Sequence, residues 1–133
     1  MSTKVPDEFV DLFSDEKKAF GFVGTVMTDG TPQVTPVWID YDGEYISFNT
    51  AKGRVKERNL RRNPSVAITL VDPENPYRHI QIRGKASFVE QGADDHINRL
   101  AKKYIGLDEY PNRQPGEERI IVRIKPESVS TMG

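Results

Sequence analysis

The sequence predicts a mainly β (α+β) domain, in which six strands and about three helices form a small antiparallel barrel. The pairs Asp29-Gly30 and Asp42-Gly43 lie between apolar runs, and such pairs are typical of tight hairpin turns. Residues 79–88 alternate between apolar and polar side chains, as a strand with one buried face does. A chain of 133 residues has the size of one ordinary domain, so residues 1–133 are expected to form a single domain.

The first expected elements are a short helix and two strands. Pro6 suits a first helical turn, and the apolar stripe after it consists of Phe9, Leu12 and Phe13. Residues 19–28 are apolar on both faces and contain glycines, which is typical of a central strand that another segment approaches closely. The Asp29-Gly30 turn leads into a second strand, residues 33–41. Pro36 removes one ladder donor from this strand, so we expect an edge, a bulge or a ligand on that side.

The remaining expected elements are four strands and two helices, of which the first is the basic helix before Pro64 that is described below. The strands are residues 45–50, 66–71, 79–88 and 119–125. The core face of the fifth strand carries Ile80, Ile82, Ala86 and Phe88, and that of the last strand carries Ile120, Val122 and Ile124. The second helix has an apolar stripe of Ile97, Leu100, Ala101, Tyr104 and Ile105. Gly106 is placed to end this helix.

The composition excludes several classes of function. Lysine and arginine number 19 against 20 acidic residues, and a net charge of −1 gives no general attraction to nucleic acid or to an anionic membrane. The absence of cysteine excludes disulfides, thiolate nucleophiles and zinc-finger patterns. The first residues lack the apolar core of a signal peptide, and no apolar run reaches the roughly 20 residues that span a bilayer. We therefore expect a cytoplasmic protein without a membrane span and without a nucleic-acid partner.

Residues 49–64 join the third strand to a basic helix and have the outline of an anion site. Thr50 is a favourable N-cap residue, and Gly53 lets the backbone approach a ligand closely. The amides of the first helical turn have no partner within the helix. Arg54 and Lys56 add charge beside the partial positive charge of the helix end, which suits a phosphate group.

The same run also fits an ordinary solvated helix. The arginines near one helical face are Arg54, Arg58, Arg61 and Arg62, and such faces commonly contact only water. No Walker or dinucleotide glycine pattern is present to separate the two interpretations. On its pattern alone, the run leaves a phosphate site and a solvated helix equally open.

No internal catalytic constellation stands out. His79 and His96 lack the spacing of metal ligands, and we interpret them as surface or strand polar residues. Ser47, His79 and their acidic neighbours form no recognisable triad. We therefore assign no catalytic residue and no metal ligand, and we expect a bound cofactor to carry any chemistry.

Together with residues 30–38 before it and 77–86 after it, the run 49–64 resembles the split-barrel flavin and deazaflavin reductases. More narrowly, it is similar to the coenzyme F420-dependent branch of the pyridoxamine-phosphate-oxidase-like superfamily. The likeness extends over residues 20–86 and, more weakly, to the final strand. It implies an antiparallel split β-barrel that pairs as a homodimer, with the cofactor in a groove between the two barrels.

The resemblance also implies which residues hold the cofactor. The phosphate would lie at the start of the helix after the third strand, where the matching residues are Thr50, Lys52, Gly53, Arg54, Lys56 and Asn59. The ring would lie along the second strand, beside Pro36, Val37 and Trp38, with Thr25 and Val26 close by. Tyr77 and Arg78 are weaker matches, expected to come from the opposite subunit.

Two features favour F420 over riboflavin phosphate (FMN). The cations of residues 52–61 exceed what one phosphate requires, and the F420 tail continues into several carboxylates. The last strand also lacks the Arg-x-His pattern of true pyridoxamine-phosphate oxidases. We therefore expect an oxidoreductase that passes a hydride from reduced F420 to an electron-poor small molecule, such as an activated alkene, a quinone or a tetrapyrrole. The alternatives are an FMN-binding oxidoreductase of the same fold, a noncatalytic carrier of either cofactor, or a nucleic-acid binder using residues 58–62, which the net charge of −1 disfavours.

Overall fold

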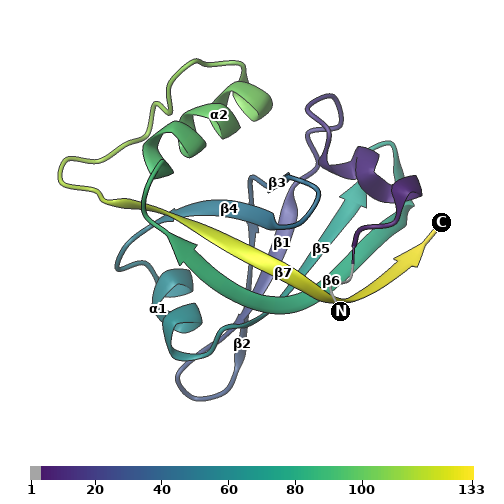
Figure 1. Cartoon of the computed structure of the whole chain (residues 1–133), viewed down its shortest axis with the longest axis horizontal. Coiled ribbons are helices and arrows are strands. Elements are labelled where there is room, and N and C mark those ends of the chain that lie inside the picture. Colours follow the sequence, from purple (N-terminus) through teal and green to yellow (C-terminus); the bar gives the residue numbers. More distant parts are fainter. Residues whose placement is uncertain (1–3) are drawn as a thin grey trace.

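An antiparallel sheet of seven strands organises the protein, whose computed structural model describes residues 4–133. The strands are β1 (Gly21–Val26), β2 (Pro32–Val37), β3 (Asp40–Tyr41), β4 (Ile46–Ala51), β5 (Ser65–Asp72), β6 (Asn75–Val89) and β7 (Arg119–Met132). They lie in the order β2-β1-β5-β6-β7-β4-β3. The long strands β6 and β7 bend, and the sheet curls into a half-barrel (Figure 1). The predicted mainly β split barrel is therefore confirmed, with one strand more than the six that we expected.

Three helices flank the sheet, as predicted. They are the 3-10 helix η1 (Asp7–Phe13) and the α-helices α1 (Val55–Arg62) and α2 (Ala93–Ile105). Helix α1 packs on β1 and β4, α2 packs on β7 and β4, and η1 contacts β5. In Figure 1, α2 and α1 lie on the same side of the molecule as the strand β4 that runs between them. No helix among residues 4–133 is long and apolar enough to cross a membrane.

The predicted second strand, residues 33–41, is divided into β2 and β3. The break falls at Ile39, whose backbone groups bond to side chains of α2 instead of a neighbouring strand. The Ile39 N–H donates to Tyr104 Oη at 3.1 Å, and the Ile39 carbonyl accepts from Lys103 Nζ at 2.8 Å. Strand β2 lies at one edge of the sheet, which is one of the three settings predicted from Pro36.

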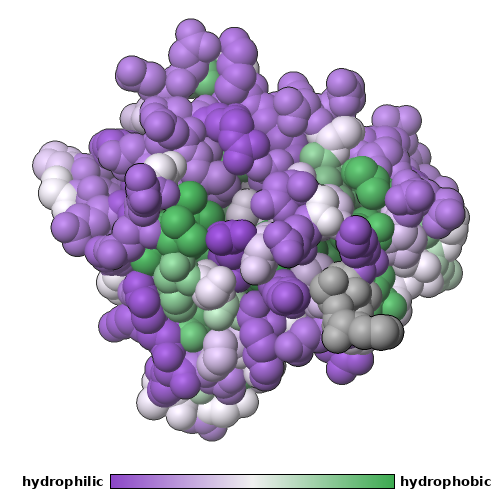
Figure 2. Space-filling view, viewed as in Figure 1, coloured by the Kyte–Doolittle hydropathy of each residue, from purple (hydrophilic) through white to green (hydrophobic). Residues whose placement is uncertain are grey.

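The core lies inside the curled sheet, and the predicted alternation is confirmed where it was clearest. Ile80 and Ile82 of β6 are fully buried, as are Ile120, Val122 and Ile124 of β7. The η1 residues Phe9, Leu12 and Phe13 are buried as predicted. Ile105, which we placed in the buried stripe of α2, is instead exposed, because it lies rotated from the centre of the stripe at the last helical residue. In the view of Figure 2, hydrophilic residues cover most of the surface, and two apolar areas interrupt them.

A β-bulge bends the long β6–β7 pair. The register places Arg83 opposite Ser128 but Gly84 opposite Pro126, so Glu127 is the extra residue on β7. At this point the two backbones come very close: a Cβ atom on Gly84 would lie 2.1 Å from the carbonyl oxygen of Lys125. Only glycine fits this crossing, which lets the sheet turn around its core.

Candidate functional site

The structure brings six of the predicted site residues together in one groove. They are Pro36, Val37, Trp38, Thr50, Arg54 and Lys56. The groove has a volume of about 530 Å³, which lies in the range of small-molecule sites. The other walls are formed by the start of β1, by α2 and by the loop 107–118. Phe20 lies just before β1 and Phe22 near its start, Ile97 and Leu100 belong to α2, and Tyr110 belongs to the loop. We call this cavity the main groove.

One wall of the main groove includes the aromatic residues Phe20, Trp38 and Tyr110, and two of them stack on Tyr104, which is buried and does not line the groove. Trp38 lies parallel to Tyr104, with ring centroids 5.5 Å apart and an interplanar angle of 5°. Phe20 stacks on the other side of Tyr104 at 5.4 Å, and Tyr110 meets Trp38 edge-on at 5.9 Å. Tyr104 is fixed because its hydroxyl donates to the Ala19 carbonyl at 2.6 Å, and burial raises the pKa of Tyr104 to about 12. The aromatic residues of this wall are therefore packed against a fixed ring, and they give the groove an apolar side.

Lys56 supplies a cation at the polar part of the groove. Its ammonium donates to Thr35 Oγ1 at 2.9 Å, and within residues 4–133 no carboxylate lies within ion-pair distance of it. Burial, and then the positive charge of Arg54, lower the pKa of Lys56. A half-buried cation without a carboxylate partner can pair with an anionic ligand through a charge-assisted hydrogen bond, so Lys56 is a candidate anion contact of the groove.

The predicted N-cap role of Thr50 is wrong. Helix α1 begins at Val55, its cap position is Arg54, and no side chain caps it. Thr50 instead ends up inside β4, only 1% exposed. The reason is Gly53, whose φ of +91° lets the chain turn between strand and helix and so delays the helix start. The N–H of Gly53 donates to Glu57 Oε1 at 2.9 Å, so a side chain of the same helix already occupies this amide.

Asn59 and Thr25 contact each other and do not line the main groove. Asn59 Nδ2 donates to Thr25 Oγ1 at 3.0 Å, and both residues are buried between α1 and β1. The carbonyl of Val26 accepts from Arg62 at 2.9 Å. Thr25 and Val26 also line a separate pocket over β1, β5 and β6. These three residues link α1 to β1 through hydrogen bonds.

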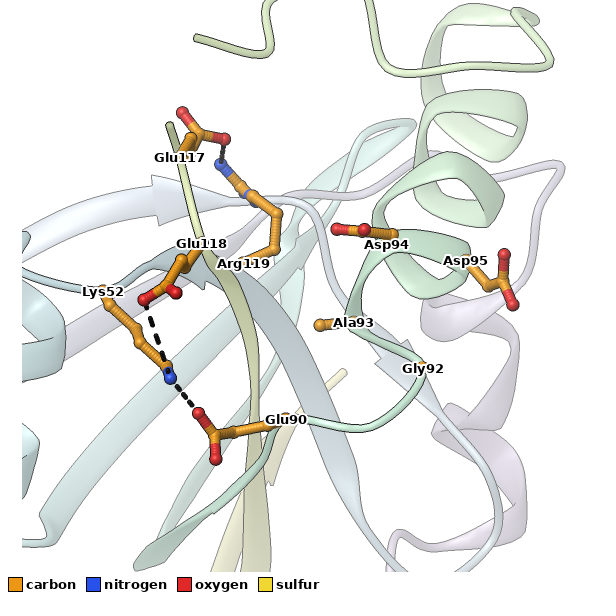
Figure 3. A pocket seen from close by; sticks show the side chains of 9 residues that line it. All are labelled: Lys52, Glu90, Gly92, Ala93, Asp94, Asp95, Glu117, Glu118 and Arg119. Carbon is orange, nitrogen blue, oxygen red and sulfur yellow. Dashed lines mark hydrogen bonds and ion pairs between the residues drawn. The ribbon is translucent and has the colours of Figure 1, made fainter. Parts of the chain in front are cut away.

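Lys52 faces an adjoining pocket lined mainly by acidic residues (Figure 3). This acidic pocket has a volume of about 560 Å³. The Lys52 ammonium forms an ion pair with Glu90 and lies 3.9 Å from Glu118 Oε2. Arg119 lines both the acidic pocket and the main groove. Within one chain, Lys52 is therefore neutralised outside the main groove.

Tyr77 and Arg78 lie outside the main groove, beside η1. Arg78 Nη2 contacts Asp11 at 2.7 Å and its Nη1 contacts Asp72 at 3.0 Å, which ties η1 to the β5–β6 hairpin. Hydrogen bonding to Arg78 lowers the pKa of Asp11 despite its partial burial. Tyr77 is exposed. Their expected contribution to the groove of an opposite subunit stays a prediction.

A buried polar network that the sequence did not reveal supports the polar part of the groove. Arg119 Nε donates to Asn49 Oδ1 at 2.8 Å, which turns the Asn49 amide nitrogen toward His96 Nδ1 at 3.0 Å. Nδ1 of His96 must then accept, so the imidazole proton is on Nε2, 3.2 Å from Ser47 Oγ. Burial lowers the pKa of His96 to about 4, so the ring is neutral at ordinary pH.

This network corrects one interpretation and extends the site. His96 is a buried residue of α2, not a surface or strand residue, because Asn49 and Ser47 satisfy both of its ring nitrogens. Asn49 lies 47 residues from His96 and 70 from Arg119 in the sequence, so no local pattern signals their contact. Among residues 4–133, no group of three or more histidine or acidic side chains is placed to hold a metal ion.

A family model and several solved structures match nearly the whole chain. A family model described as pyridoxamine 5'-phosphate oxidase matches residues 5–133. The solved structure of an F420 reductase is similar over 95% of this chain and 98% of its own, with a TM-score of 0.81 and 33% sequence identity. The conserved hypothetical protein Rv2991 from Mycobacterium tuberculosis matches over 96% of this chain and 84% of its own, with a TM-score of 0.73 and 24% identity. General Stress Protein 26 from Bacillus anthracis matches over 94% and 92%, with a TM-score of 0.69 and 18% identity. The last two likenesses concern the fold alone.

Proposed function

The chain belongs to the pyridoxamine 5'-phosphate oxidase family, and on that premise we propose that it is an F420-dependent oxidoreductase acting on an electron-poor small molecule. The observation that carries the proposal is the main groove, which combines an aromatic wall with the half-buried cation Lys56. An F420 reductase that is 33% identical over nearly the whole chain supports the choice of cofactor. When bound, reduced F420 supplies a hydride from its deazaflavin ring.

The residues of the groove fit such a cofactor. Trp38, held against Tyr104, would contribute an apolar contact to a tricyclic ring, and Phe20 and Tyr110 would help to exclude water from it. Lys56, with Arg54 beside it, would hold the phosphodiester through charge-assisted hydrogen bonds. The role of this chain in the reaction is thus to bind and orient the ring and to keep the site dry.

FMN remains the second candidate, because less free positive charge is present than the sequence suggested. Arg61 Nε contacts Glu57 Oε2 at 2.7 Å, and Lys52 pairs with Glu90 and Glu118. These two cations are therefore already neutralised before any tail of several carboxylates binds. The remaining charge near Lys56 suits one phosphate as well as it suits the phosphodiester of F420.

Titration of the purified protein with F420 and with FMN, followed by the fluorescence of each cofactor, tests the proposal. We expect saturable binding of F420, and we expect the protein to accelerate oxidation of reduced F420 by at least one member of a panel of quinones and activated alkenes. Tighter binding of FMN than of F420 would favour the second candidate. Binding without turnover across the panel would indicate a carrier, and saturation by neither cofactor would contradict the proposal.

Trp38 is expected to report on cofactor binding. It is the one tryptophan of the chain, and it lies in the wall of the main groove against Tyr104 and Tyr110. A bound tricycle close to this ring would quench the tryptophan emission, and the quench should saturate together with the cofactor fluorescence. Unchanged emission at saturating cofactor would place the ring elsewhere and leave Trp38 a packing residue.

We further propose that the protein pairs as a homodimer. Val34 on the edge strand β2 is exposed, as are Phe22 on the neighbouring strand β1 and Phe20 just before it. Edge strands with exposed apolar side chains are commonly covered by a partner. Sedimentation velocity at micromolar concentration should therefore give twice the mass of one chain. A single monomeric species under these conditions would rule out the pairing.

A further inference from the structure

One carboxylate, that of Glu117, joins two arginines of the main groove. Its Oε1 accepts from Arg119 Nη1 at 2.7 Å, and its Oε2 lies 3.4 Å from Arg54 Nη2. The Glu117 side chain is only 6% exposed, although it belongs to the loop 107–118. Figure 3 shows this carboxylate turned toward Arg119, whereas the neighbouring Glu118 turns toward Lys52. The chain thus places a negative charge of its own among the cations that line the groove.

The two arginines are held to different degrees. The Arg119 side chain is 3% exposed and is also fixed by Asn49, at 2.8 Å from Nε, and by the ring of Tyr110, 5.2 Å away. Arg54 is 51% exposed, and its contact with Glu117 is long. Arg119 therefore keeps its position without the charge of Glu117, while Arg54 can exchange this carboxylate for another anion.

Glu117 is charged at neutral pH. Burial raises its pKa, but the hydrogen bond and charge of Arg119, and the charge of Arg54, outweigh this effect and hold the pKa of Glu117 below its usual value. Three cations, Arg54, Lys56 and Arg119, accordingly line the polar part of the groove. Glu117 lines the adjoining acidic pocket and contacts two of these cations, Arg54 and Arg119, from there. An anionic ligand is attracted by the cations and repelled by Glu117 at the same time.

We infer that Glu117 is an internal counter-ion that sets how strongly, and for how many negative charges, the main groove binds an anionic group. In the free protein its carboxylate takes the place of a ligand anion at Arg54. Glu117 thereby determines specificity: it weakens the binding of every anion and penalises a multiply charged group most. The identification of that anion with the phosphodiester of F420 rests on the proposed function, whereas the effect on anions in general does not.

The test compares Glu117→Gln with Glu118→Gln. The two changes remove the same charge from adjacent residues, but Glu118 is 73% exposed and contacts Lys52 in the acidic pocket. Glutamine has the shape of glutamate, and its amide oxygen can still accept from Arg119, so the loop should keep its fold. Glu117→Asp keeps the charge and controls for any change in packing. Thermal unfolding of each variant confirms that it is folded before titration.

Each protein is titrated by calorimetry at low ionic strength with inorganic phosphate, with F420 and with the deazaflavin chromophore that lacks the phosphodiester. Glu117→Gln should bind phosphate and F420 about five- to tenfold more tightly than the unmodified chain, because one like charge near the ligand is removed. The chromophore, Glu118→Gln and Glu117→Asp should each show less than about a twofold change.

The outcomes separate this inference from the proposed function. Equal or weaker phosphate binding by Glu117→Gln would overturn the inference, because Glu117 would then hold the arginines in place rather than neutralise them. An equal gain in Glu118→Gln or Glu117→Asp would overturn it as well. Suppose that the unmodified chain and its variants bound neither F420 nor, in the titration described above, FMN, while Glu117→Gln still bound phosphate more tightly than the unmodified chain. The inference about Glu117 would then hold, and the cofactor assignment would be wrong.

Discussion

Alanine at position 84 is expected to destabilise the fold by at least about 3 kcal/mol, the largest effect that we predict for a single methyl group. The added Cβ would lie 2.1 Å from the Lys125 carbonyl oxygen and 3.1 Å from its carbonyl carbon. Both atoms belong to the backbone of β7, so no side-chain rotation relieves the clash, and the β6–β7 pair must separate at the bulge. Urea unfolding followed by circular dichroism measures the loss, unless the variant fails to fold at all.

Gly24→Ala is the matched control for Gly84→Ala. Gly24 also lies within a strand, β1, but the nearest atom to an added Cβ is the Ala67 carbonyl oxygen at 3.7 Å, an ordinary contact. Its stability should change by less than about 1 kcal/mol, because alanine costs less conformational entropy than glycine. Similar unfolding midpoints for the two variants would show that the crossing at Gly84 is not a steric constraint.

Replacement of Lys56 with alanine is expected to weaken F420 binding by about ten- to a hundredfold, as the loss of a charge-assisted contact worth about 1.5–3 kcal/mol implies. The change removes the one cation of the main groove for which no carboxylate lies within ion-pair distance among residues 4–133. Folding should hardly change, because burial already disfavours the charged form of Lys56. Calorimetric titration with F420 and a thermal melt measure the two effects.

Lys102→Ala provides the matched control for Lys56→Ala. Lys102 is an exposed lysine of α2 that contacts Asp108 at 3.2 Å and does not line the groove. Its removal alters the same net charge at a screened position, so the F420 affinity should change by less than about twofold. An equal loss in both variants that disappears in moderate salt would reduce Lys56 to a general electrostatic contribution.

Arg61 is unsuitable as a neutral control, although the sequence placed it on a solvated face. Its guanidinium contacts Glu57 at 2.7 Å and lies 3.9 Å above the ring of Phe88. The spacing of Glu57 and Arg61 by four residues is the local signal that predicts their contact on a helix. Because Glu57 neutralises Arg61, the helix offers less positive charge to a ligand than its arginines alone indicate.

The fold was predictable because its signals are local. Alternation in β6 and two Asp-Gly turns depend on neighbouring residues, and these were confirmed in the sheet order and register. The segments 36–38 and 50–56 each contribute several residues to the main groove, so a resemblance carried by short motifs was enough to find them. The exact start of α1 was not predictable, because Gly53 adopts a positive φ that its neighbours do not signal.

The polar part of the groove was less accessible to the sequence, because its members meet only through the fold. Glu117 contacts Arg54 across 63 residues, and Arg119 contacts Asn49 across 70. The partners that neutralise Lys52 likewise come from the end of β6 and from the loop before β7. A charge counted along the chain therefore overstates the charge that a ligand would meet, since distant carboxylates fold back onto it.

The break between β2 and β3 has a consequence for how the protein opens. Lys103 donates both to the Ile39 carbonyl and to the carbonyl of Phe13, at the end of η1, while Tyr104 binds the Ala19 carbonyl. Two adjacent residues of α2 thus link three separate segments through backbone oxygens that have left the regular ladder. The amides of the three segments should exchange as one unit, because none of the segments can detach from α2 without breaking bonds to Lys103 or Tyr104. We therefore expect Trp38, which stacks on Tyr104, and the N-terminal 3-10 helix to open together, so that a ligand that rigidifies Trp38 should also slow amide exchange in residues 7–13.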